Sequence, residues 1–258
     1  MRKRGIKVNG LLMAARYCLT PAKQRICTSK ESDFKALRSF LLREHFDETE
    51  RARQVMSSFP VMFPYLELIA RENGISDSFD SRVVEAYYIG NELTDKVSFS
   101  KTTQKLYQAF SNPRLLGPTE AQSRIAQLSE KYRPHHNFHI FCFGSVTSDL
   151  DYSNISLASL FLSQCFIGWG IVKSAKAETA IIKDAPTIEP KNGRLVLEPK
   201  GGETLINYDP ETDPPIKKGD PVSVHWGRVC QKLDRTQYQS LKHYTNLALI
   251  ASNLWGEQ

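Results

Sequence analysis

Cysteine is scarce in this sequence, and the few cysteines stand apart from one another. Only five occur among the 258 residues, at positions 18, 27, 142, 165 and 230. A disulfide framework or a zinc ribbon needs cysteines in close pairs, so this spacing argues against both. No apolar segment with a cleavage site follows the basic start, MRKRGIKV, and a secretory signal is therefore not expected. We expect reduced thiols in a cytoplasmic protein.

Long apolar runs are missing as well. The one long stretch without a charged side chain covers residues 152–172, and a transmembrane helix needs about 20 mainly apolar residues. This stretch instead contains four serines, an asparagine and a glutamine, and then Gly168 and Gly170. We therefore expect no membrane span.

Several familiar catalytic and nucleotide-binding motifs are also absent. The sequence has no GxxxxGK[ST] phosphate loop, no GxGxxG after a strand, no GxSxG elbow and no HExxH. The 34 basic residues exceed the 28 acidic residues only slightly, for a net charge of +6. A surplus of this size is weak evidence for an acidic partner, so we do not expect nucleic acid to be the partner.

The first 160 residues carry apolar side chains at helical spacing. In one segment Val83, Val84, Tyr87 and Tyr88 form a stripe, and Asp80 is positioned to cap it. Segments of this kind predict a bundle-like helical domain. The expected helices cover residues 9–19, 31–45, 47–59, 65–73, 80–93, 98–110 and 119–132.

The pattern changes after residue 164 to short segments rich in Val, Ile and Leu, separated by Pro, Gly, Asn and Asp. A last helix is expected from Asp234, which is spaced with Gln237 as a capping pair. We therefore predict an α+β protein, with an all-helical domain at 1–163 followed at 164–258 by a small OB-like β-barrel with a C-terminal helix. The expected strand segments are 165–174, 178–184, 193–199, 203–208 and 220–231.

The second part carries a recognisable order of residues: a cysteine, an apolar stretch, several strands, and then IKKGDPVSVHWG and QKLDRTQ. This order resembles the HypC/HupF-type hydrogenase maturation chaperones over about 90 residues. In that family the cysteine directly follows the initiator methionine, whereas 164 residues precede it here. The matching residues are Cys165, Gly170, Val172, Gly219, Asp220, Val224, His225 and Gly227.

The resemblance implies a role in handling iron. In the family, the cysteine and the late histidine hold or pass on iron that carries cyanide and carbonyl ligands and is destined for a nickel-iron hydrogenase. By position these roles fall to Cys165 and His225. Thiolate and imidazole are both suitable iron ligands, and two protein ligands alone would leave the metal open for handover.

The segment RPHHNFHIFCF holds three of the six histidines, His135, His136 and His139. On a helix or on a strand, His135 and His139 would share one face and could chelate a metal, with His136 turned away on a helix. Cys142 lies one helical turn further on. The segments GLLMAARY, PYLELIARENGI, RVVEAYYIGNEL and PHHNFHIF, ahead of such a barrel, also resemble an uncharacterised prokaryotic family.

Three hypotheses follow for the function. The leading one is an iron-handling accessory or chaperone protein of nickel-iron hydrogenase maturation, rather than an enzyme, with the hydrogenase large subunit or another maturation protein as its partner. The second is a metalloenzyme whose site is formed by His135, His136 and His139. The third is an OB-like nucleic-acid-binding protein. Whether Cys165 and His225 meet the histidine run in space is left open by the sequence.

Overall fold

The chain folds as a set of helices followed by a C-terminal sheet and a last helix. The computed structural model describes residues 10–26, 28, 30–43, 46–143, 161–191, 194–199 and 201–253. The helices are α1 (Gly10–Lys23), α2 (Glu31–Arg43), α3 (Phe46–Ser57), α4 (Met62–Glu72), α5 (Ser81–Tyr88), α6 (Glu92–Asp95), α7 (Phe99–Phe110), α8 (Gly117–Ala126), α9 (His136–Phe138), the π-helix η1 (His139–Phe143) and α11 (Arg235–Asn253).

The sheet contains five strands that pair in the order β1-β2-β5-β7-β6, and β6 pairs back with β1. The pairing is antiparallel except between β5 and β7, which meet only at Asn207 and Arg228. A separate hairpin is formed by β3 and β4. The strands are β1 (Gly168–Lys176), β2 (Glu178–Lys183), β3 (Pro186–Lys191), β4 (Arg194–Pro199), β5 (Glu203–Tyr208), β6 (Pro221–His225) and β7 (Arg228–Lys232).

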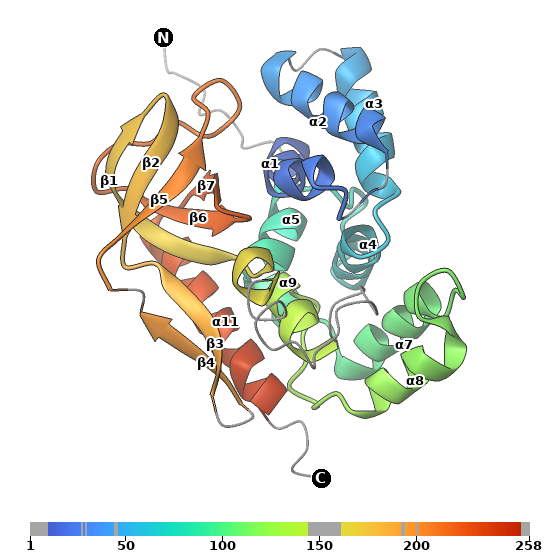
Figure 1. The fold of residues 1–258 in the computed structure, drawn as a ribbon. Helices are drawn as coiled ribbons and strands as arrows, with labels where there is room; N and C mark the ends of the chain where they lie inside the picture. Colours follow the sequence, from blue (N-terminus) through green and yellow to red (C-terminus); the bar gives the residue numbers. More distant parts are fainter. Residues whose placement is uncertain are drawn as a thin grey trace.

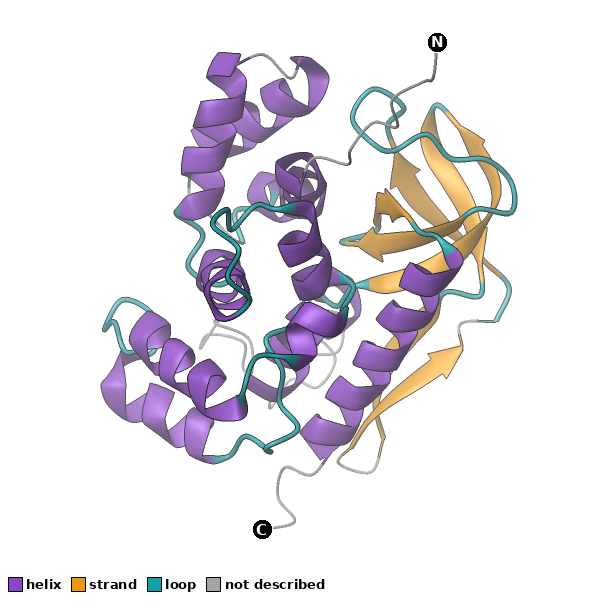
Figure 2. Cartoon of the chain, turned by 180° about the vertical axis from the view of Figure 1, so that it is seen from behind, coloured by secondary structure: helices purple, strands orange, loops and turns teal. Residues whose placement is uncertain are grey.

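The sheet lies on one side of the molecule and the helices α1–α8 lie on the other, with α9 at the boundary (Figure 1). Figure 2 shows α11 running along the sheet side, where it packs against α9, η1, β4 and β6. One continuous apolar core joins the two parts, since it includes Tyr87 and Phe138 as well as Trp169 and Leu241. A smaller apolar cluster within the sheet includes Val172.

The expected helices are confirmed, with two differences in their bounds. The expected helix 80–93 is interrupted at Gly90, whose φ is 91°, and forms α5 and α6. The expected helix 119–132 ends at Ala126, as α8. Asp80 caps α5 by accepting a hydrogen bond from the Arg82 N–H. Gly74 follows α4 with a positive φ of 66°, as expected for a glycine just past a helix end. At the start of α11 the Asp234 and Gln237 side chains each accept from the other's backbone N–H, at 2.8 and 3.1 Å.

Two features of the sheet differ from the expectation. Strand β3 was not predicted, because Pro186 and Pro190 argue against a strand; it pairs only with β4, and an edge strand tolerates proline. The expected single segment 220–231 is two strands, β6 and β7, joined at Trp226 and Gly227. The part of the expected first strand that precedes Gly168 is also not β-structure, since residues 161–165 are helical.

Asn137 joins the helical part to the sheet part. Its side-chain oxygen accepts from the Ile167 N–H at 2.7 Å, and its amide donates to the Ile167 carbonyl at 3.1 Å. The same amide donates to the Thr245 hydroxyl of α11 at 2.8 Å. The Asn137 side chain is fully buried, so these bonds form away from water, where an unpaired group is costly.

No helix among the residues described is both long enough and apolar enough to cross a membrane. Residues 152–160 of the charge-free stretch lie outside the described residues.

We predict that Asn137→Ala destabilises the protein by about 4 kcal/mol, because it leaves the buried N–H and C=O of Ile167 without partners. The free energy of unfolding in urea measures this loss. The matched control is Asn246→Ala on the exposed side of α11, which should change stability by less than about 0.5 kcal/mol. Equal stability of the two variants would show that Asn137 is not the joint between the two parts.

Candidate metal centre

Three segments far apart in the sequence meet at one place. Helix α9 supplies His136, the segment before β1 supplies Cys165, and the end of β6 supplies His225. One ligand atom from each of these residues lies within 4.8 Å of those of the other two. Among the described residues this is the one such group of three or more, and we call it the His–Cys–His cluster. All three side chains are buried.

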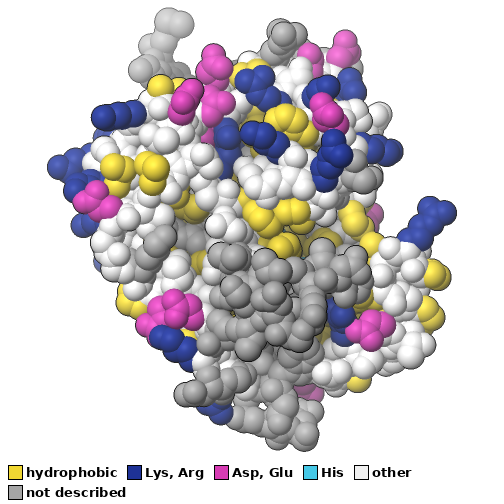
Figure 3. Space-filling view, in the orientation of Figure 1, with side chains coloured by type: hydrophobic (Ala, Val, Ile, Leu, Met, Phe, Trp, Pro, Cys, Tyr) yellow, Lys and Arg dark blue, Asp and Glu magenta, His cyan; other side chains and the backbone are white. Residues whose placement is uncertain are grey.

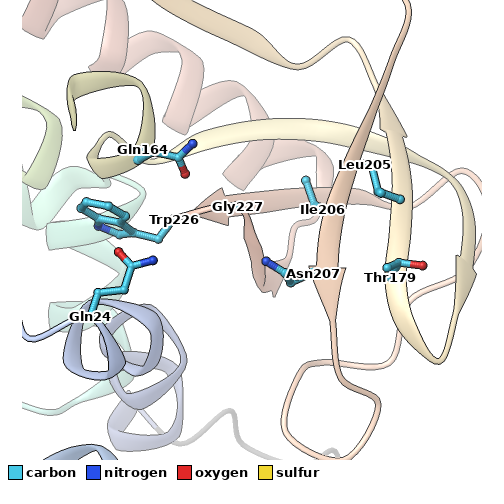
Figure 4. Close-up of a pocket in the computed structure, with 8 residues that line it drawn as sticks. All are labelled: Gln24, Gln164, Thr179, Leu205, Ile206, Asn207, Trp226 and Gly227. Carbon is cyan, nitrogen blue, oxygen red and sulfur yellow. The ribbon is translucent and has the colours of Figure 1, made fainter. Parts of the chain in front are cut away.

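The turn between β6 and β7 places His225. Its two residues, Trp226 and Gly227, have φ angles of 51° and 65°, which fits a tight hairpin turn with two left-handed residues. The Trp226 N–H donates to the Gln164 carbonyl at 2.9 Å. Figure 4 shows the Trp226 ring between the side chains of Gln164 and Gln24, beside a surface depression. The turn is thus fixed against the residue that precedes Cys165.

Main-chain carbonyls set the tautomers of both histidines in the cluster. His225 Nδ1 lies 2.9 Å from the Tyr17 carbonyl, and His136 Nε2 lies 2.9 Å from the Cys165 carbonyl. A carbonyl only accepts, so each of these nitrogens carries the proton. His225 Nε2 and His136 Nδ1 therefore keep their lone pairs, as a metal ligand requires.

Few hydrogen-bond donors lie near the two nitrogens that carry the lone pairs. His136 Nδ1 faces the Tyr87 hydroxyl at 3.2 Å. His225 Nε2 is buried and makes no hydrogen bond of good geometry within the described chain. An unpaired buried polar atom costs free energy, and a bound cation would remove that cost.

A cavity of about 250 Å³ adjoins the cluster. Most of its wall is apolar or aromatic, and no Asp, Glu, Lys or Arg is among the described residues that line it. Cys18 and Met62 add two sulfur atoms, 3.6 Å apart, to the same wall. Apolar side chains also gather in the middle of the face shown in Figure 3, and no described histidine is visible on it. The cavity beside the cluster is therefore weakly polar along its described wall.

The other two histidines of the run occupy different surroundings. His135 accepts from the Asn137 N–H at 3.1 Å through Nδ1, and its ring stacks on Tyr244. His139 lines the cavity, with Nδ1 hydrogen-bonded to the Tyr65 hydroxyl at 2.8 Å. The structure therefore groups His136, rather than the expected pair of His135 and His139, with Cys165 and His225.

A family model described as a family of unknown function (DUF6390) matches residues 6–257. The chain belongs to DUF6390. This agrees with the resemblance of the whole sequence to an uncharacterised family, whereas the resemblance of its last third to hydrogenase maturation chaperones is not shown by the comparison. No curated protein and no solved structure matched the chain.

Burial keeps four histidines of this DUF6390 chain neutral, namely His135, His136, His139 and His225. Loss of hydration lowers the pKa of His136 to about 4 and that of His225 to about 3. The neighbouring His136 lowers the pKa of His225 further, while the Tyr17 and Cys165 carbonyls act in the opposite direction. Burial likewise lowers the pKa of His135 and of His139 to about 3.

The sequence-based predictions missed the groups that orient the ligands. Asn137 stands inside the histidine run but was not considered, because its partners are the backbone of Ile167 and a threonine 108 residues away. Tyr17 acts through its carbonyl, so its side chain gives no indication of the role. Only the position of Asn137 between two candidate ligands could have drawn attention to it.

We predict that the DUF6390 chain loses stability in mild acid. All four buried histidines have pKa values below the unfolded value of about 6.5, so unfolding takes up protons as the pH falls below it. Four protons correspond to about 5 kcal/mol between pH 7.5 and pH 5.5. Urea unfolding at the two pH values measures this difference.

The variant His139→Phe provides the control for this prediction. It removes one of the four buried histidines. The decrease in the free energy of unfolding between pH 7.5 and pH 5.5 should therefore be smaller by about a quarter. Equal stability of the wild-type chain at pH 7.5 and pH 5.5 would contradict the buried neutral histidines.

Proposed function

We propose that the chain is a metal-handling accessory protein that binds one iron ion at the His–Cys–His cluster. The observation that carries this proposal is the convergence of His136, Cys165 and His225 within 4.8 Å in a buried position. Cys165 and His225 are 60 positions apart, and the resemblance to maturation chaperones singles out both from the sequence alone.

The ligand set suits a borderline transition metal. Two imidazoles and a thiolate bind Fe(II), Co(II), Cu and Zn well, and bind Mg²⁺ and Ca²⁺ poorly. In a tetrahedral complex with bonds of 2.0–2.3 Å, donor atoms lie about 3.5 Å apart. The ligand atoms of the cluster, which lie within 4.8 Å of one another, would therefore have to move closer together around a bound ion.

Three protein ligands leave a coordination position open, and such a site suits transfer of an ion better than permanent storage.

The closed pairing of five strands followed by α11 supports an OB-like β-barrel of the HypC/HupF type. Nickel-iron hydrogenase maturation is the function that this resemblance suggests, with the hydrogenase large subunit or another maturation protein as partner. The geometry favours this interpretation over a metalloenzyme site at His135, His136 and His139, because His135 points its Nδ1 at the backbone of Asn137.

We predict that anaerobically prepared protein binds one Fe(II) per chain. Cys165→Ala, His136→Gln and His225→Gln should each weaken binding by more than about 100-fold, since changes to groups that merely orient a ligand already cost 10- to 100-fold. Titration followed by elemental analysis measures the stoichiometry.

The chain offers matched controls for these variants. His135→Gln removes a buried histidine next to His136, and Cys142→Ala removes a buried thiol outside the cluster. Both should still bind one iron. A wild-type chain that takes up no iron, or a Cys165→Ala variant that binds it as tightly as wild type, would refute the proposal.

We further predict that the iron-loaded protein transfers ⁵⁷Fe to the iron-free precursor of a hydrogenase large subunit. The readout is the label that remains on the large subunit after the two proteins are separated. Cys142→Ala should transfer iron like the wild type. If the large subunit takes up iron no faster from the loaded protein than from free Fe(II), the accessory role is contradicted. The proposal that the chain binds a metal would still stand.

A further inference from the structure

We propose that His139 is a hydrogen-bond donor, rather than a metal ligand, and that its Nε2–H binds a small ligand held at the open coordination position of the cluster's metal. The ligand class is a small molecule or singly charged anion with a terminal acceptor atom. This inference rests on the proposed metal site and adds a second binding group to it.

A buried chain of hydrogen bonds defines the protonation of His139. The Tyr132 and Tyr65 hydroxyls lie 2.6 Å apart, and Tyr65 lies 2.8 Å from His139 Nδ1. Both tyrosines are buried, and Tyr65 is the one partner of the Tyr132 hydroxyl within the described residues.

The protons of these three hydrogen-bonded side chains can be placed in only one favourable way among the described residues. If His139 donated from Nδ1, Tyr65 would donate to Tyr132, and the Tyr132 proton would have no acceptor in the described chain. A buried donor without an acceptor is costly. Tyr132 therefore donates to Tyr65, Tyr65 donates to Nδ1, and the ring proton of His139 is on Nε2.

His139 and the metal cluster share the same cavity. His136, His139, Cys165 and His225 all line it. Because Nδ1 is held by Tyr65, Nε2 is the nitrogen that remains for a molecule inside the cavity. The His139 ring packs against Phe110, with ring centroids 5.5 Å apart, and against Phe143, with ring centroids 5.4 Å apart.

The cavity limits what the ligand can be. Its volume of about 250 Å³ equals that of roughly eight water molecules. No described acidic or basic side chain other than histidine lines it, so a ligand with several charges would remain uncompensated. A ligand of this class needs one acceptor atom that faces His139 and one atom with a lone pair that faces the metal.

Azide binding to the cobalt(II)-loaded full chain tests the proposal, with the visible absorption of cobalt as readout. His139→Phe keeps an aromatic ring against Phe110 but removes the donor, so it should weaken azide by about 10- to 100-fold, as expected for a hydrogen bond to a charged group. Cobalt affinity should stay unchanged. His139→Gln restores an N–H near the Nε2 position and should bind azide nearly as well as wild type.

His135→Phe is the control, because His135 does not line the cavity; it should bind azide like wild type. Equal azide affinity in wild type and His139→Phe, or no azide effect on wild-type cobalt protein, would overturn the inference while the metal site stands. Failure of cobalt to bind at all would reject the proposed function, and the inference with it.

A second measurement needs no variant. Long-range ¹H–¹⁵N spectra of the wild-type chain should show His139 protonated at Nε2, and azide added to the cobalt-free protein should leave this resonance in place. A proton on Nδ1 would overturn the proposal even if His139→Phe failed to fold.

Discussion

The structure depends on how the helical part holds the backbone of residues 164–167. Asn137 pairs with both backbone groups of Ile167, and His136 donates to the carbonyl of Cys165. From the other side, the Trp226 N–H donates to the carbonyl of Gln164. These bonds form in a buried region where unpaired groups are costly, so they fix the entry into β1 and the direction of the Cys165 side chain together.

The same bonds orient the candidate ligands of the proposed metal site. The carbonyl that anchors His136 belongs to Cys165, so one ligand orients another. His225 is held in the complementary tautomer by the Tyr17 carbonyl of α1. Helices and sheet thus each contribute a ligand whose lone pair is free of a proton, and burial keeps it so by lowering the pKa of both histidines. In the proposed site the helical part, which precedes the sheet in the chain, therefore supplies His136 as a third candidate ligand.

Much of the fold could be predicted from the sequence because its signals are local. The cap at Asp80 and the pair Asp234 and Gln237 act within one helical turn, and both are as expected. The proposed site was predictable only in part. Cys165 and His225 were found through a resemblance, but the choice of His136 over His135 and His139 depends on a short α-helix that passes into a π-helix, which spacing alone does not indicate.

X-ray absorption at the cobalt or iron edge tests the metal centre most directly, since it counts the ligands by element. We predict one sulfur at about 2.3 Å and two imidazole nitrogens at about 2.0–2.1 Å. In Cys165→Ala the sulfur contribution should disappear, whereas in Cys142→Ala it should remain. A metal surrounded only by oxygen and nitrogen in the wild-type protein would contradict a centre built from His136, Cys165 and His225.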